Sequence, residues 1–134
     1  MRRILRNSII CADGTELVSR YTWDMQCYFD GSNRCFCIDG GENYLKRTGV
    51  GYTENSVIDD GTLELQRNTC EWGRNYDKSG KKLKQTEWIK IKDLGTEHIY
   101  NILENVPMIS NFYMRLFWDE LRYREELILK SYEN

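Results

Sequence analysis

Hydrophobic and polar positions change their period once along the chain. Up to about residue 93, short segments rich in β-branched, aromatic and cysteine residues alternate with turn pairs such as Asp13-Gly14 and Ser79-Gly80, a pattern typical of hairpins. In the last segment Ile89 and Ile91 share one face and Trp88 takes the other. The expected strand segments are residues 4–11, 15–29, 34–38, 63–72 and 83–92. These segments predict an antiparallel sheet of about five to six strands, with one face covered.

After Asp93 the apolar positions recur at helical spacing. Thr96 is a good N-cap residue, and Pro107 closes the first helical segment. The apolar positions between them are Ile99, Ile102, Leu103 and Val106. A second helix is expected to begin near Ser110. The sheet is therefore followed by two C-terminal α-helices.

The second helix is apolar around most of its circumference. One stripe consists of Met114, Phe117, Trp118, Leu121 and Ile128, and the remaining surface carries Phe112, Tyr113, Leu116, Tyr123 and Leu127. One contact with a sheet cannot bury so wide a surface, and large exposed apolar patches are uncommon on soluble monomers. We therefore expect a homo-oligomer, a dimer or higher, in which a second subunit covers part of this helix.

Length and composition set the class of protein. The chain has 134 residues, of which 40% are hydrophobic, and a formal net charge of -2. These values predict a single α+β domain over residues 1–134, mainly β over 1–93 and mainly α over 94–134. No apolar run approaches the roughly 20 residues that a membrane span needs, so a soluble protein that is not exported is expected.

Cysteine usage favours reduced thiols. The five cysteines are Cys11, Cys27, Cys35, Cys37 and Cys70. An odd number without a secretion signal indicates a cytosolic protein, with disulfides as the less favoured interpretation. The C-x-C spacing of Cys35 and Cys37 differs from a zinc knuckle, and the single histidine, His98, is distant in sequence. In a strand the two side chains share one face, and burial beside Ile38 explains at least one of them without a metal, so we expect no cofactor.

Charge is unevenly distributed. Residues 74–92 hold seven basic and two acidic residues, a net +5, whereas residues 39–66 have a net charge of -4. A protein that coats long nucleic acid needs a basic excess over the whole domain, which this chain lacks. The patch suits a small anion or an acidic segment of another subunit, and a solvated hairpin is the plain alternative.

The sequence offers little catalytic chemistry. A single histidine must serve any acid–base role, and no nucleophile elbow, phosphate-binding loop or zinc-protease motif occurs. A metal site made by Asp39 with Asp59 or Asp60 would support a small hydrolase, although Asp-Gly turns are the commoner explanation. We expect no catalytic residues.

Aromatic and arginine residues gather in the second half of the chain. Flat rings stack on bases, and guanidinium groups bind phosphates through two hydrogen bonds. The candidate ligand-binding residues are Trp72, Trp88, His98, Arg115, Trp118, Arg122 and Tyr123. Two stacked bases and three charge-assisted hydrogen bonds supply roughly 6.5 to 15 kcal/mol before the cost of association. The alternative is that Trp88 and Trp118 are core residues. Arg115 and Arg122 then pair with Asp119, Glu125 or Glu126.

Several stretches resemble a widespread family of small bacteriophage and prophage proteins, most of which have no assigned function. They are residues 13–20, 38–47, 71–73, 92–99, 102–103 and 119–124, in the same order as in the family. The chain departs from the family at residues 21–24, where some relatives have a histidine-rich stretch, and it lacks the paired cysteines of shorter members. This departure argues further against zinc.

The size, the sheet followed by two helices and the expected oligomer also resemble the Thoeris anti-defence sponge proteins of phages. Those proteins sequester cyclic ADP-ribose signals, and some bind cyclic oligonucleotides, without cleaving them. The resemblance implies a pocket between subunits, with Trp88, His98, Arg115 and Arg122 as counterparts of its lining. It also implies a phage protein that acts in the host bacterial cytoplasm and binds a small nucleotide signalling molecule. Two alternatives stay open, a module that binds a host or phage protein and a metal-dependent hydrolase of the same signal.

Overall fold

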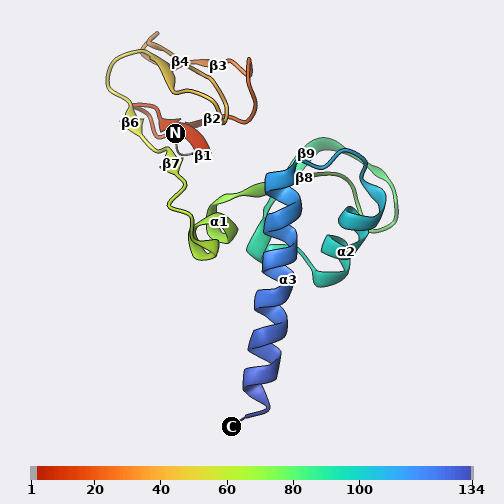
Figure 1. The fold of residues 1–134 in the computed structure, drawn as a ribbon. Helices are drawn as coiled ribbons and strands as arrows, with labels where there is room; N and C mark the ends of the chain where they lie inside the picture. The colour runs from red at the N-terminus through yellow and green to blue at the C-terminus, as the bar shows by residue number, and fades with distance from the viewer. Residues whose placement is uncertain (1–2, 134) are drawn as a thin grey trace. The chain divides into compact units, whose positions relative to one another are not determined.

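The computed structural model describes residues 3–133, which form two compact units divided between Asp60 and Gly61. The described residues form nine β-strands, all paired antiparallel, and three α-helices, of which the last lies at the C-terminus (Figure 1). The predicted α+β class is therefore confirmed. The strands are spread over several small sheets rather than one, and the single domain expected from the length stays a prediction.

The first unit contains seven of the strands: β1 (Ile4–Ile10), β2 (Glu16–Ser19), β3 (Gln26–Phe29), β4 (Cys35–Asp39), β5 (Lys46–Thr48), β6 (Thr53–Glu54) and β7 (Val57–Ile58). One sheet has the order β2-β1-β6, with β7 also pairing with β1, and the other has the order β3-β4-β5. The predicted strand over residues 15–29 is in fact two strands, because the chain turns between Ser19 and Gln26.

A small core joins the two sheets of the first unit. Ile9 of β1 and Phe36 and Ile38 of β4 are almost completely buried, together with Cys11. Phe36 and Ile38 are two residues apart, so both point to the core, while Cys35, Cys37 and Asp39 point to the opposite face of β4. The alternation along β4 thus separates an apolar inner face from an outer face that carries thiols.

The prediction of reduced thiols is wrong for two cysteines on the outer face of β3 and β4. Cys27 and Cys37 lie directly opposite each other in the register, with their Cα atoms 4.1 Å apart, and they form a disulfide. The sequence could not show this pairing, because it depends on where the turn between β3 and β4 sets the register. The remaining cysteines, Cys11, Cys35 and Cys70, are not part of a disulfide.

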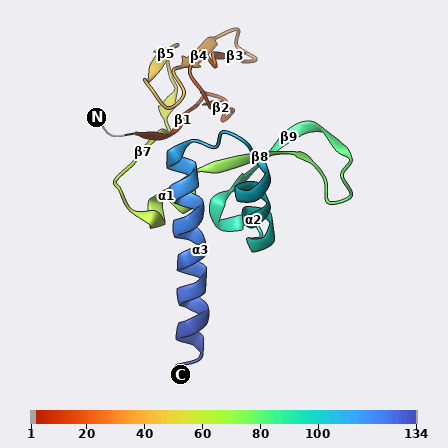
Figure 2. The same cartoon turned by 45° about the vertical axis from the view of Figure 1, so that its right-hand side comes forward.

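The second unit contains a hairpin and all the helices. Its elements are α1 (Leu63–Thr69), β8 (Glu71–Tyr76), β9 (Lys82–Lys90), the 3-10 turn η1 (Ile91–Asp93), α2 (Thr96–Asn105) and α3 (Asn111–Ser131). Figures 1 and 2 show that the C-terminal half of α3 extends beyond the other elements of this unit. No helix of the described chain is both long and apolar enough to cross a membrane.

The strand predicted over residues 63–72 is wrong, because residues 63–69 form α1. The side chain of Thr62 accepts a hydrogen bond from the Leu65 backbone N–H and Glu64 lies in the first turn, and both features favour a helix start. Only the residues after Cys70 enter a strand. The segment is too short for its apolar period to distinguish a helix from a strand.

The two predicted C-terminal helices are confirmed, with one corrected cap. The Ser110 side chain caps α3 by accepting from the Tyr113 backbone N–H at 3.2 Å. Thr96 is the first residue of α2 rather than its N-cap, which is Gly95. The Thr96 hydroxyl instead accepts a hydrogen bond from Arg124 of α3 at 3.0 Å, so it links the two helices.

The predicted apolar stripe of α3 is only partly buried. Phe117 and Leu121 belong to the core as expected, whereas Met114, Trp118 and Ile128 are 43 to 57% exposed. The buried face instead includes Leu116 and the carboxylate residue Glu120. The helix therefore packs on its own unit along a face rotated away from the predicted stripe.

Candidate functional site

All seven candidate ligand-binding residues lie in the second unit, but the structure divides them into separate groups. Trp72 and Trp88 are on opposite faces of the β8–β9 hairpin, because Trp72 pairs with Ile89 and Trp88 pairs with Gly73, one position along. The two indole rings therefore cannot contribute to one ligand within a single chain.

Trp72 packs inside the second unit. Its ring meets Tyr113 and Phe117 of α3 edge-on, with centroid distances of 5.9 and 5.3 Å. The Tyr113 hydroxyl donates a hydrogen bond to the backbone oxygen of Glu71, which ties α3 to β8 beside this ring. Such edge-to-face contacts are favourable packing arrangements. Trp72 thus holds the hairpin against α3.

Trp88 lies on the outer face of the hairpin and is 41% exposed. Its ring covers Gly73, where an added Cβ atom would come within 2.9 Å of the indole. Thr86 and Lys90 lie two residues before and after Trp88 on β9, so they share its face, and Lys90 is exposed. This face combines an aromatic ring with part of the predicted basic patch.

Tyr123 and its neighbours form a buried ionic network that the sequence did not reveal. Arg67 of α1 lies over the Tyr123 ring, 4.6 Å from its centroid. The same guanidinium makes two hydrogen bonds to Glu120, at 2.6 and 3.0 Å, and Glu120 is completely buried. Arg124 donates to Glu120 at 2.8 Å and to the backbone oxygens of Ile91 and Lys92. Tyr123 therefore borders a network that joins α1, η1, α2 and α3.

His98 lies half-buried in the first turn of α2. Burial lowers its pKa below the usual histidine value, and the positive charge of Arg74 lowers it further. Arg74 forms an ion pair with Glu87 at 2.6 Å, while its buried Nε atom has no hydrogen-bond partner among residues 3–133. The lowered pKa therefore favours the neutral form of the His98 ring.

The remaining three candidate residues do come together. Arg115, Trp118 and Arg122 follow one another along the exposed side of α3, at spacings of three and four residues. Trp118 is 49% exposed and meets Tyr100 of α2 edge-on at 6.4 Å, and Tyr100 is also nearly half exposed. We call Tyr100, Arg115, Trp118 and Arg122 the α2–α3 surface.

The two arginines of the α2–α3 surface are only weakly engaged. Arg122 reaches Asp119 at 4.0 Å, the limit of an ion pair, and its side chain is 71% exposed. Arg115 is exposed and makes no hydrogen bond or ion pair with any residue that the structure describes. The expected alternative, in which both arginines are neutralised by neighbouring carboxylates, thus holds at most for Arg122. Two guanidinium groups beside an indole can bind a flat anion.

Comparisons with protein-family models, with curated proteins and with solved structures found no match to this chain. The resemblance to phage proteins therefore stays a prediction.

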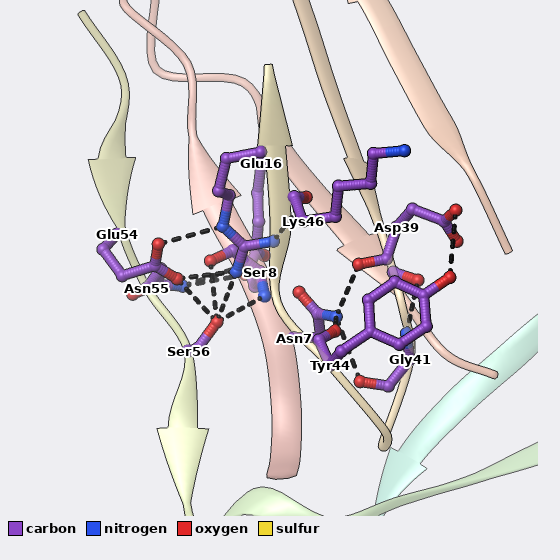
Figure 3. A network of polar contacts seen from close by, with 12 residues as sticks. Asn7, Ser8, Glu16, Asp39, Gly41, Tyr44, Lys46, Glu54, Asn55 and Ser56 are labelled. Carbon is purple, nitrogen blue, oxygen red and sulfur yellow. Dashed lines mark hydrogen bonds and ion pairs between the residues drawn. The ribbon is translucent and has the colours of Figure 1, made fainter. Parts of the chain in front are cut away.

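Carboxylates of the first unit are engaged in a polar network (Figure 3). Glu16 accepts hydrogen bonds from Arg6, Ser8 and Asn55, and Glu54 accepts from Arg47 and Ser56. Burial opposes ionisation of Glu16, but the bonds from Ser8 and Arg6 outweigh it and lower its pKa. The bond from Arg47 is the main cause of the lowered pKa of Glu54. Glu16 thus links β2 to β1 and to Asn55, and Glu54 links β6 to β5 and to Ser56.

Asp39, offered by the sequence as part of a metal site, lies at the end of β4. Its carboxylate accepts from the Gly40 backbone N–H at 2.7 Å and from the Tyr44 hydroxyl at 3.4 Å (Figure 3). Nearby, Asn7 donates to the backbone oxygens of Gly41 and Tyr44. In the described part of the chain, no group of three or more His, Cys, Asp or Glu residues is arranged to hold a metal ion. These contacts shape the turn after β4.

Proposed function

We propose that this protein binds a small nucleotide-derived anion at the α2–α3 surface and sequesters it without cleaving it. The observation that carries the proposal is that Arg115 has no partner within the described chain and lies beside the half-exposed ring of Trp118. A base or nicotinamide-sized ring can stack on the indole while the arginines bind phosphate oxygens. In the setting that the resemblance implies, the ligand is a host immune signal such as a cyclic ADP-ribose isomer, captured by a phage anti-defence protein in the bacterial cytoplasm.

The energy available from one chain indicates that two copies are needed. One stacked ring supplies about 1 to 3 kcal/mol and two charge-assisted hydrogen bonds about 3 to 6 kcal/mol, before any cost of association. Nanomolar sequestration needs about 12 kcal/mol. Two copies that present their α2–α3 surfaces to the same ligand double the gross energy and cover the ligand from both sides. The proposed function therefore includes a homo-oligomer.

A thermal-shift panel of cyclic ADP-ribose isomers and cyclic di- and trinucleotides tests the proposal. We expect one ligand class to raise the melting temperature of the wild-type protein and to be recovered intact after heat denaturation. Lys78→Ala, which removes one positive charge from the turn between β8 and β9, away from the α2–α3 surface, should keep the shift. Recovery of a cleaved product would favour the hydrolase instead.

A module that binds another protein is a second candidate function, favoured by the C-terminal end of α3. Leu127, Ile128, Leu129 and Tyr132 are 49 to 81% exposed there. Exposed apolar and aromatic residues of this kind are typical of interface centres. Recovery of a host protein in fixed stoichiometry, which Ile128→Asp abolishes, together with no response to any nucleotide, would support this function over sequestration.

A further inference from the structure

Three of the five cysteines gather on the outer face of the β3–β4 pair. Cys27 faces Cys37 across the strands and is bonded to it. Cys35 precedes Cys37 by two residues on β4, so its side chain points to the same face, and the sulfur atoms of Cys35 and Cys37 are 3.7 Å apart. A thiol therefore lies in van der Waals contact with one sulfur of a disulfide.

This cluster is accessible, whereas the other thiols are not. Cys27 is exposed and Cys35 and Cys37 are half-buried. Cys11 and Cys70 are buried, and burial raises the pKa of Cys11, which makes its thiol unreactive. Exposed disulfides are the ones that exchange readily, and exchange proceeds by attack of a thiolate on a disulfide sulfur. The sulfur of Cys35 lies within contact distance of the disulfide sulfur of Cys37, where such an attack begins.

We propose that Cys27, Cys35 and Cys37 form a thiol–disulfide exchange site. The Cys35 thiol loses its proton to solvent, and the thiolate attacks the sulfur of Cys37. The Cys27–Cys37 bond breaks as the Cys35–Cys37 bond forms, and Cys27 leaves as a thiolate that takes up a proton. The step is redox-neutral, and it converts the half-buried thiol of Cys35 into an exposed thiol at Cys27.

The exposed Cys27 thiol is the group that reacts with small disulfides in solution. Its thiolate attacks one sulfur of a low-molecular-weight disulfide, whose own bond breaks. A mixed disulfide forms at Cys27 and one small thiolate leaves. The site thus takes small disulfides, and Cys35 determines whether Cys27 is available to them.

The sequence allows the two disulfides to be told apart directly. Trypsin cleaves after Arg20, Arg34 and Lys46, which places Cys27 in peptide 21–34 and both Cys35 and Cys37 in peptide 35–46. The Cys27–Cys37 bond joins the two peptides. The Cys35–Cys37 bond lies within one of them and releases peptide 21–34 with an unbonded Cys27.

The experiment uses the full chain, purified in its oxidised form, treated with N-ethylmaleimide in the folded state and digested without reduction. We expect two populations in the wild type: joined peptides with label on Cys35, and separate peptides with label on Cys27. Incubation with glutathione disulfide before labelling should give a mixed disulfide on peptide 21–34. In Cys35→Ser, both the label and the mixed disulfide on Cys27 should fall to background.

Cys70→Ala is the matched control, because it removes a thiol of the second unit and should leave the Cys27 reactions unchanged. Circular dichroism establishes that each variant is folded. Three results overturn the proposal: label on Cys35 alone in the wild type, equal reaction of Cys27 in wild type and Cys35→Ser, or no disulfide between these cysteines after oxidation.

Discussion

Replacing Glu120 by alanine should strongly destabilise the second unit. The Glu120 carboxylate is completely buried and accepts three hydrogen bonds from Arg67 and Arg124, at 2.6 to 3.0 Å. Removing it leaves two guanidinium groups without their shared anion. Breaking a buried ion pair by deleting one partner costs about 3 to 5 kcal/mol, since the remaining charge stays desolvated.

The expected loss is large for a unit of this size. A domain of 60 to 100 residues loses about 4 to 8 °C of melting temperature per kcal/mol, so Glu120→Ala should lower it by roughly 12 to 40 °C. Urea unfolding followed by tryptophan fluorescence measures the free energy, because three of the four tryptophans, Trp72, Trp88 and Trp118, are in this unit. Glu120→Gln, which keeps one oxygen acceptor, should fall between the alanine variant and the wild type.

Glu126→Ala is the matched control, because Glu126 is an exposed carboxylate on the same helix. Its effect should stay within about 0.5 kcal/mol. The reasoning is refuted if Glu120→Ala unfolds within 1 kcal/mol of the wild type. That result would mean that Arg67 and Arg124 find water or other acceptors without loss.

Three further predictions concern the second unit. Because the pKa of His98 is lowered in the folded state, the unfolded chain binds more protons, so stability should fall as the pH drops from about 7 to 5. His98→Gln should flatten this part of the pH profile in urea titrations, and an unchanged profile would remove His98 as the cause. Gly73→Ala should cost about 1 to 3 kcal/mol through the clash of its Cβ with the Trp88 ring and with Thr86, and thermal unfolding equal to wild type would contradict the packing described for Trp88. Trp118→Ala should abolish the thermal shift by a nucleotide while Trp88→Ala keeps it, and the reverse result would place the site on the hairpin.

Features decided by neighbouring residues could be predicted from the sequence. Ser110 as the cap of α3 and the alternation that puts Ile89 and Trp88 on opposite faces of β9 are of this kind. Both depend on residues within one turn or one strand, where local hydrogen bonding and side-chain direction determine the outcome.

Features that depend on packing between distant segments were missed. The buried face of α3 includes Glu120 because Arg67, 53 residues earlier, neutralises its charge. A prediction from hydrophobic periodicity places every carboxylate on the exposed side, so it could not find this residue. The residues of the predicted ligand site lie in separate places for the same reason. Trp72 packs against Tyr113 and Phe117 of α3. Tyr100, which belongs to no recognisable sequence motif, lies beside Trp118.

The most direct test of the proposed function is isothermal titration calorimetry of the ligand selected by the thermal-shift panel. Because two chains share one ligand, the double variant Arg115→Ala/Arg122→Ala loses four charge-assisted hydrogen bonds per ligand, roughly 6 to 12 kcal/mol in all. Its affinity should therefore fall by at least about 10⁴, with a melting temperature equal to that of the wild type. Lys78→Ala should bind as the wild type does, with one ligand shared between two chains. Equal affinity of the double variant, or no binding of any nucleotide in the panel by the wild type, would contradict the proposal.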